Sequence, residues 1–243
     1  MIAAKAGGAQ VSTGKIADSA NLKKAANDLL KSRGESIVVA GSNDKNVQIL
    51  VNAINSLLGN YGTTIDIDKS VNLRKGNDAQ MNRLVDNMKN KSAGAVIFFN
   101  CNPVYDHARG AEIATAMAGL PATISTADRS DETSALVKFN APDHHYLESW
   151  NDFEPVSGIY SFSQPTIRNI FDTRQAQESF LVWSGSTTTS YYDYLRDRWS
   201  SHSNVTNFPN FQLFFDDCLY KGVLEDYTAP EESAAFSYDV SGV

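Results

Sequence analysis

Short, wholly apolar strands alternate with helical segments over residues 36–140, and this alternation constrains the fold more than any other feature. The predicted strands lie at 36–41, 63–67, 95–99, 122–125 and 136–139. Apolar residues between them recur at helical spacing. Strands that are apolar throughout are typical of a parallel sheet covered on both faces. Since crossover connections are right-handed, the pattern predicts a Rossmann-like, doubly wound α/β fold with a mostly parallel sheet.

Composition separates this α/β part from an aromatic and acidic remainder. Residues 1–122 carry a net charge of +4, residues 123–243 carry −11, and 21 of the 25 aromatic residues lie in the second half. We predict a flexible lead-in at 1–19, the α/β domain at 20–142, an aromatic, acidic segment with helices packing on that domain at 143–227, and a loose tail at 228–243. The aromatic half is interpreted either as the core of one fold or as a docking surface for a basic partner chain.

The overall composition excludes several classes of protein. A net charge of −7 argues against a nucleic-acid-binding protein. No run approaches the roughly 20 apolar residues of a spanning helix, so no direct membrane span is expected. Two cysteines, Cys101 and Cys218, exclude a disulfide-dense module and a cysteine-ligated iron–sulfur cluster within this chain. The first residues contain no apolar core of signal-peptide length.

Polar residues follow three predicted strands, at the position where ligands bind in open α/β sheets. They are Gly41, Ser42 and Asn43 after the first strand, Asp66 after the second, and Asn100 and Asn102 after the third. A single glycine is not the dinucleotide-binding motif, so a plain strand-to-helix turn is the preferred interpretation of the first group. The two amides at the third strand tip are suited to bonding either a base edge or the local backbone.

Cysteine and histidine residues give no convincing catalytic or metal-binding pattern. Cys101 precedes a helix N-terminus, which would favour a lowered thiol pKa, but a half-buried structural cysteine is the preferred interpretation. A dyad with His107 is the alternative. His144 and His145 are adjacent in a loop, and we expect hydrogen bonds to the backbone there rather than metal binding.

Residues 143–175 show no clear periodicity, and we expect them to be ordered and to wrap back over the sheet domain. Glu148, Asp152 and Glu154 are interpreted as a solvated rim. The candidate residues for docking a partner are aromatic: Tyr146, Trp150, Phe153 and Tyr160.

The stretch from Leu136 to Ser184 carries the most specific motifs of the chain. It reads LVKFNAPDHHYLESWNDFEP, and QPTIR, FDTRQ and WS follow. This stretch resembles the molybdopterin-oxidoreductase-like region of the iron–sulfur B subunit of bacterial alternative complex III, a quinol:electron-acceptor oxidoreductase. The resemblance covers roughly residues 20–225. Asn102-Pro103 is similar to the Gly-x-Asn-Pro loop of molybdopterin enzymes, with Asn100 where glycine is usual.

The resemblance implies a function in electron transport. The family keeps the molybdopterin fold without the cofactor, so the chain is expected to be a structural domain with no cofactor and no catalysis of its own. Iron–sulfur clusters are expected elsewhere in a longer polypeptide. The implied partners are other subunits of a membrane-bound quinol:cytochrome c oxidoreductase on the periplasmic side of the inner membrane.

Two alternatives remain open. In the first, the chain is a working domain that binds a molybdopterin guanine dinucleotide. The residues that line the guanosine end of this cofactor are then the six at the strand ends: Gly41, Ser42, Asn43, Asp66, Asn100 and Asn102. Stoichiometric molybdenum or tungsten in the full subunit would favour this alternative. In the second, the chain is a free-standing nucleotide-binding enzyme, which a natural chain of 243 residues would favour.

Overall fold

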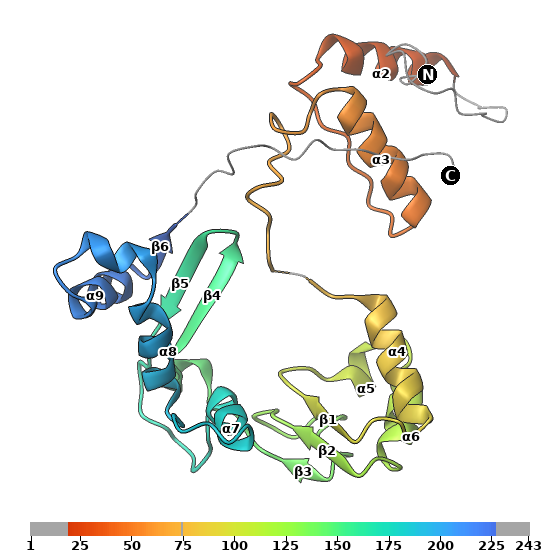
Figure 1. The fold of residues 1–243 in the computed structure, drawn as a ribbon. Helices are drawn as coiled ribbons and strands as arrows, with labels where there is room; N and C mark the ends of the chain where they lie inside the picture. Colours follow the sequence, from red (N-terminus) through yellow and green to blue (C-terminus); the bar gives the residue numbers. More distant parts are fainter. Residues whose placement is uncertain (1–18, 74, 227–243) are drawn as a thin grey trace. The chain divides into compact units, whose positions relative to one another are not determined.

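The computed structural model describes residues 19–73 and 75–226 (Figure 1). The described residues fall into two compact units, divided between Val71 and Asn72. Apart from Ser19, the predicted lead-in lies outside the described residues, and so does the predicted tail. Among the described residues, no helix combines the length and the hydrophobicity of a membrane-spanning segment.

The described residues of the first unit form the helices α2 (Ser19–Lys31) and α3 (Lys45–Leu57). The helical spacing between the first two predicted strands had indicated α3, and this helix is confirmed. Asp44 caps α3, since its Oδ1 accepts hydrogen bonds from the backbone N–H groups of Asn46 and Val47 at 2.8 and 3.0 Å.

The strands predicted at 36–41 and 63–67 are not formed, which corrects the expected sheet. The amide side chain of Asn55 binds both the N–H and the C=O of Val38, at 2.9 and 2.8 Å. These are the groups that a neighbouring strand would use. In the second segment, Ile65 forms an isolated bridge to Tyr61, closed by a local turn.

A three-stranded parallel sheet lies in the second unit. Its strands are β1 (Ala95–Phe98), β2 (Ala122–Ser125) and β3 (Phe139–Asn140), in that spatial order. Helix α4 (Asp78–Lys89) precedes β1, and helices α5 (Pro103–Asp106) and α6 (Gly110–Met117) connect β1 to β2. These elements confirm a mixed α/β fold with a parallel sheet. The sheet has three strands instead of the five that were predicted.

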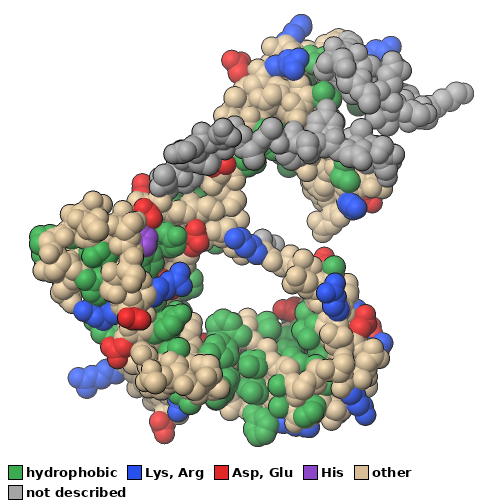
Figure 2. Space-filling view, viewed as in Figure 1, with side chains coloured by type: hydrophobic (Ala, Val, Ile, Leu, Met, Phe, Trp, Pro, Cys, Tyr) green, Lys and Arg blue, Asp and Glu red, His purple; other side chains and the backbone are tan. Residues whose placement is uncertain are grey.

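The two faces of this sheet differ. Val96 and Phe98 point to one face and are buried against Val85, Met88, Ile113 and Met117 of α4 and α6. The register aligns Ile97, Ile124 and Phe139 in a row on the opposite face. Ile97 and Phe139 are exposed, and hydrophobic side chains gather over β1–β3 in Figure 2. We name this surface the bare sheet face; within the second unit, α7 reaches it through a ring contact of Phe180 with Phe99.

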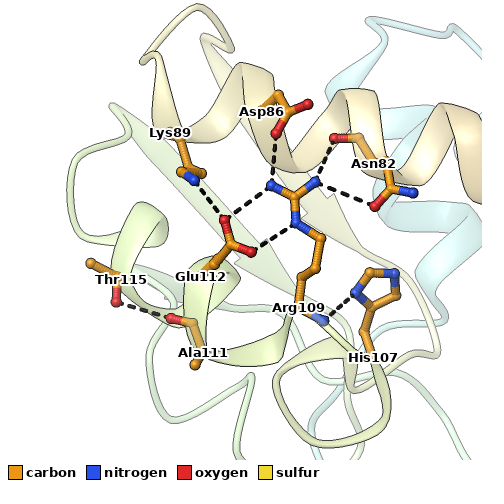
Figure 3. Close-up of polar contacts among 8 residues, drawn as sticks. All are labelled: Asn82, Asp86, Lys89, His107, Arg109, Ala111, Glu112 and Thr115. Atoms are coloured by element: carbon orange, nitrogen blue, oxygen red, sulfur yellow. Dashed lines mark hydrogen bonds and ion pairs between the residues drawn. The ribbon is translucent and has the colours of Figure 1, made fainter.

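An ion-pair network joins α4 to the start of α6 (Figure 3). Arg109 Nε donates to Glu112 Oε1 at 2.9 Å, and its Nη2 donates to Asp86 Oδ1 at 2.7 Å. Lys89 Nζ lies 2.6 Å from Glu112 Oε2. The hydrogen bonds from Arg109 and then Lys89 lower the pKa of Glu112 from its ordinary 4.5 to about 2.

This network predicts a pH-dependent contribution to stability. A carboxylate with a depressed folded-state pKa stabilises the fold above its unfolded pKa, and the contribution is lost as the pH falls through the folded value. We therefore expect the Tm of the wild-type protein to exceed that of Glu112→Gln at neutral pH. The difference should shrink between pH 4.5 and about 2. Thermal unfolding of both proteins across this range checks it; a difference independent of pH would contradict the ionic origin.

The acidic, aromatic segment contains regular structure that the sequence had not indicated. An antiparallel hairpin of β4 (Asn151–Val156) and β5 (Ile159–Ser163) pairs with β6 (Val223–Glu225) in a second sheet. The tight turn between β4 and β5 requires a left-handed residue, which Gly158 provides at φ 75°. The expectation that residues 143–175 lack regular secondary structure is therefore wrong for the segment that forms the hairpin.

An aromatic core holds this second sheet against helices. The helices are α7 (Ala176–Trp183), α8 (Tyr191–Ser200) and α9 (Phe211–Lys221), which confirms the prediction of helices within residues 143–227. Two short 3-10 helices, η1 (Tyr146–Glu148) and η2 (Ser203–Asn207), accompany them. Leu195, Trp199, Phe214, Phe215 and Cys218 are buried at the centre, with Trp150, Tyr160 and Phe162 packed around them.

Candidate functional site

A pocket of about 670 Å³ opens at the carboxyl ends of the three parallel strands. The segments 99–102, 127–131 and 143–149, which follow β1, β2 and β3, supply most of its lining. Strand β4, with Gln177 of α7 and Tyr191 of α8, supplies the rest. Open α/β sheets bind ligands at this edge, so the pocket is the candidate functional site.

Asn100 and Asn102, predicted from their place at a strand tip, both line this pocket. Asn102 is occupied by structural bonds: its Oδ1 accepts from the N–H and the hydroxyl of Thr133 at 3.1 and 2.7 Å, and its Nδ2 donates to Glu132 at 2.7 Å. Asn102 therefore holds the loop that follows β2. Asn100 has a left-handed backbone at φ 49°, which asparagine tolerates better than most residues. Its backbone N–H donates to Thr126 Oγ1 at 3.3 Å.

The other four predicted ligand-binding residues, Gly41, Ser42, Asn43 and Asp66, belong to the first unit. The hydroxyl of Ser42 accepts from the N–H of Asp44 at 3.1 Å. Asp66 Oδ1 accepts from the N–H groups of Asp68 and Lys69 at 3.1 and 3.2 Å, which closes a local turn. The structure thus shows local turn contacts for Ser42 and Asp66, and the ligand-binding role of the six residues stays a prediction.

Four aspartates line the pocket: Asp128, Asp131, Asp143 and Asp152. Asp143 Oδ1 accepts from the N–H groups of His144 and Ala176 at 2.8 and 2.7 Å, which fixes the start of α7 to the loop after β3. Burial raises the pKa of the Asp143 carboxyl. A cation near this carboxylate would therefore be favourable at neutral pH.

Glu148 and Asp152 are not the solvated rim that the sequence suggested. Asp152 Oδ2 accepts from the indole N–H of Trp199 at 3.0 Å, and its Oδ1 lies 3.5 Å from the Tyr191 hydroxyl. Burial, together with the negative charge of Asp152, raises the pKa of Tyr191 to about 12. Asp152 therefore connects the wall of the pocket to the aromatic core.

Glu148 is 7% exposed and joins two loops. Its Oε2 accepts from the N–H of His145 at 3.2 Å, and its Oε1 accepts from the N–H of Ile170 at 3.1 Å. The carbonyl of Leu147 accepts two further N–H groups, from Thr166 and Ile167 at 2.7 and 3.1 Å. These bonds hold η1, and with it the aromatic edge of the pocket, against residues 166–170.

The four predicted docking residues divide into two pairs. Tyr146 and Phe153 line the pocket and are 71% and 57% exposed. Trp150 packs on Tyr192 with ring centroids 4.5 Å apart, and Tyr160 packs on Trp199 at 5.1 Å. Trp150 and Tyr160 therefore belong to the aromatic core, whereas Tyr146 and Phe153 are available to a partner. Their docking role stays a prediction.

The histidines form hydrogen bonds both within their own turns and to distant segments. His107 Nδ1 accepts from the N–H of Arg109, and His145 Nδ1 accepts from the N–H of Leu147. His144 Nε2 lies 3.0 Å from the carbonyl of Thr173. The expected backbone bonding of the His144–His145 pair is thus confirmed. In the described ranges, no three His, Cys, Asp or Glu residues are grouped as a metal site.

Cys101 lies at the pocket, and its thiol pKa is raised rather than lowered. Cys101 is exposed, which corrects the expected half-buried position. Desolvation by the surrounding protein is the main cause of the raised pKa, and the negative charges of Asp106 and Asp131 add to it. We expect iodoacetamide to alkylate Cys101 at neutral pH more slowly than it alkylates free cysteine. Cys218 is buried, with its pKa raised to about 11, and should react only after unfolding. Mass spectrometry of timed reactions measures both rates; a Cys101 that reacts faster than free cysteine would contradict the assignment.

No protein-family model matches this sequence, and a search of curated proteins finds no relative.

Proposed function

We propose that the chain is a structural, cofactor-free domain of a bacterial electron-transfer complex of the alternative complex III type. In this proposal it lies on the periplasmic side of the inner membrane and contacts other subunits of a quinol:cytochrome c oxidoreductase. The motifs between Leu136 and Ser184 support the family, and iron–sulfur clusters belong to another part of the full subunit. The role of this chain is to dock and position those subunits.

The observation that carries the proposal is the bare sheet face. Parallel sheets are almost always covered on both faces, because helices cross over between their strands. Here Ile97 and Phe139 are exposed on the sheet, and Trp183 of α7 is exposed as well. An apolar surface of this kind marks an interaction site. We propose that it is the second face of a Rossmann-like, doubly wound domain, covered by a further layer in the complete assembly.

A molybdopterin guanine dinucleotide is the second candidate, because the pocket lies at the strand ends where nucleotides bind. The lining residues fit this cofactor poorly. A diphosphate requires cations and free N–H groups, and the described residues that line the pocket include four aspartates, with Arg129 as their single lysine or arginine. The amide of Asn102 is already used by Thr133 and Glu132. We therefore favour docking over cofactor binding.

Purification from the native host tests the proposal. We expect the affinity-tagged protein, extracted from membranes in detergent, to elute as a stoichiometric subunit of one complex with the absorbance of a redox protein. The variants Phe139→Ser and Trp183→Ser should lower its recovery in that complex. Tyr220→Ser, at an exposed residue of α9, is the matched control and should leave recovery unchanged.

Two outcomes would contradict the proposal. One is recovery of the tagged protein alone, with the wild-type sequence and the variants behaving alike. The other is stoichiometric molybdenum or tungsten with a pterin bound to the chain, which would establish the second candidate instead.

A further inference from the structure

We propose that the pocket at the carboxyl ends of β1, β2 and β3 receives an arginine side chain from a partner subunit. This inference rests on the proposed function, since the partner is another subunit of the same complex. It adds the chemistry by which that subunit is recognised.

The walls of the pocket carry aromatic rings that are open to a ligand. Phe99, Tyr146 and Phe153 line the pocket and are all exposed. They come from three separate segments: Phe99 directly follows β1, Tyr146 lies in the segment after β3, and Phe153 lies on β4. The planar guanidinium group stacks on aromatic faces and is more weakly hydrated than an ammonium group. The pocket therefore offers surfaces that favour arginine over lysine.

The carboxylates of the pocket exceed its cations. Among the lining residues that the structure describes, Arg129 is the one lysine or arginine, and it already pairs with Asp128 at 2.9 Å. Asp152 also has a cation nearby, since Arg198 Nε lies 4.0 Å from Asp152 Oδ2. Asp131 and Asp143 have no Lys or Arg within ion-pairing distance among the described residues. These two carboxylates are the groups that a guanidinium would neutralise.

The hydrogen bonds of these two aspartates leave acceptor capacity free. Asp143 uses Oδ1 for both of its bonds, and Asp131 uses Oδ1 for the N–H of Ser134. In the described part of the chain, no hydrogen bond reaches the Oδ2 atom of either residue. A guanidinium has five N–H donors in a rigid fork, which suits carboxylate oxygens held in fixed positions.

The local potential agrees with this assignment. Asp106 and Asp131 contribute to the raised pKa of the Cys101 thiol, and Asp152 contributes to that of Tyr191. Both groups line the pocket and resist a further negative charge. The same field attracts a cation. At about 670 Å³, the pocket has room for an arginine and the residues that flank it.

The experiment uses the whole chain and short synthetic peptides. The probe is acetyl-Gly-Arg-Gly-amide, and its matched control is the citrulline peptide, which has nearly the same shape and no charge. Proton–nitrogen NMR spectra recorded during titration should show shifts confined to the residues that line the pocket. We expect the citrulline peptide and the lysine peptide each to bind about tenfold more weakly.

Two variants connect the binding to the pocket. Asp143→Asn keeps the Oδ1 acceptor for Ala176 and removes the charge, and it should weaken binding of the arginine peptide about tenfold. Phe153→Ser removes an exposed ring and should weaken binding about fivefold. Asp217→Asn, a surface aspartate of α9 paired with Lys221, should leave the affinity unchanged.

Equal binding of the arginine and citrulline peptides would overturn the proposal. Tighter or equal binding of the lysine peptide, shifts outside the pocket, or unchanged affinity in both variants would also overturn it. The peptide-binding experiments test the pocket separately from the purification, which tests the proposed function. A chain recovered alone from membranes would contradict the proposed function even if the pocket bound arginine.

Discussion

Phe215→Ala is expected to lower the free energy of unfolding by about 3–5 kcal/mol. Phe215 is 1% exposed and lies at the centre of the aromatic core. Its ring contacts Phe211 of α9, Tyr192 of α8 and Phe162 of β5, with centroids 5.5 to 6.3 Å apart. Removing the ring leaves a cavity between two helices and the second sheet, so the loss includes both transfer and packing energy.

Urea unfolding followed by tryptophan fluorescence measures this change. Tyr220→Ala is the matched control because it removes an aromatic ring of similar size from the same helix. Tyr220 is 91% exposed, so its loss should alter stability by no more than about 0.5 kcal/mol. Equal destabilisation by the two substitutions would show that the core is not packed as described.

Most of the described α-helices were predictable because the information that specifies a helix is local. In α9, Phe211, Phe214 and Phe215 recur at helical spacing, and Asn210 supplies a cap through its bond to the N–H of Leu213 at 3.0 Å. Both signals lie within a few residues of one another. The spacing of the apolar residues therefore specifies the helix and the face that it buries, whichever sheet that face packs on.

The strand predictions failed where pairing depends on distant residues. Segment 36–41 has the composition of a buried strand, yet Asn55, in the last turn of α3, takes the backbone groups of Val38. Nothing in the segment itself indicates that competition. The β4–β5 hairpin was missed although a signal existed. Tyr160 and Phe162 alternate with serines and both contact Trp199, and a glycine precedes this run.

Only two of the six predicted site residues line the candidate pocket, and the chemistry of the pocket was not predicted. The rule that ligands bind at the carboxyl ends of parallel strands led to Asn100 and Asn102, and both line the pocket. The four aspartates come from two loops and from strand β4, with no common motif, and their environments are set by groups far along the chain. Trp199, which binds Asp152, is 47 residues away from it.

The last prediction concerns Glu148, and we expect Glu148→Ala to lower the free energy of unfolding by about 3 kcal/mol. The carboxylate accepts one backbone N–H with each oxygen, from His145 and from Ile170. Hydrogen bonds to a charged group contribute about 1.5–3 kcal/mol each, and alanine would leave both donors without this acceptor in a largely buried site. Amide exchange should accelerate at residues 145–149 and 166–171 before it changes in the aromatic core.

Glu154→Ala is the matched control for Glu148→Ala. Glu154 also accepts a backbone N–H, from Gly158 at 3.0 Å, but its side chain is exposed, so water replaces the lost acceptor. Its loss should cost about 0.5–1 kcal/mol, with exchange altered only in the hairpin turn. If Glu148→Ala cost no more than Glu154→Ala, or if exchange accelerated evenly over the chain, Glu148 would not be the residue that holds the two loops together. In that case the exposed ring of Tyr146 would lack the fixed position that docking of a partner requires.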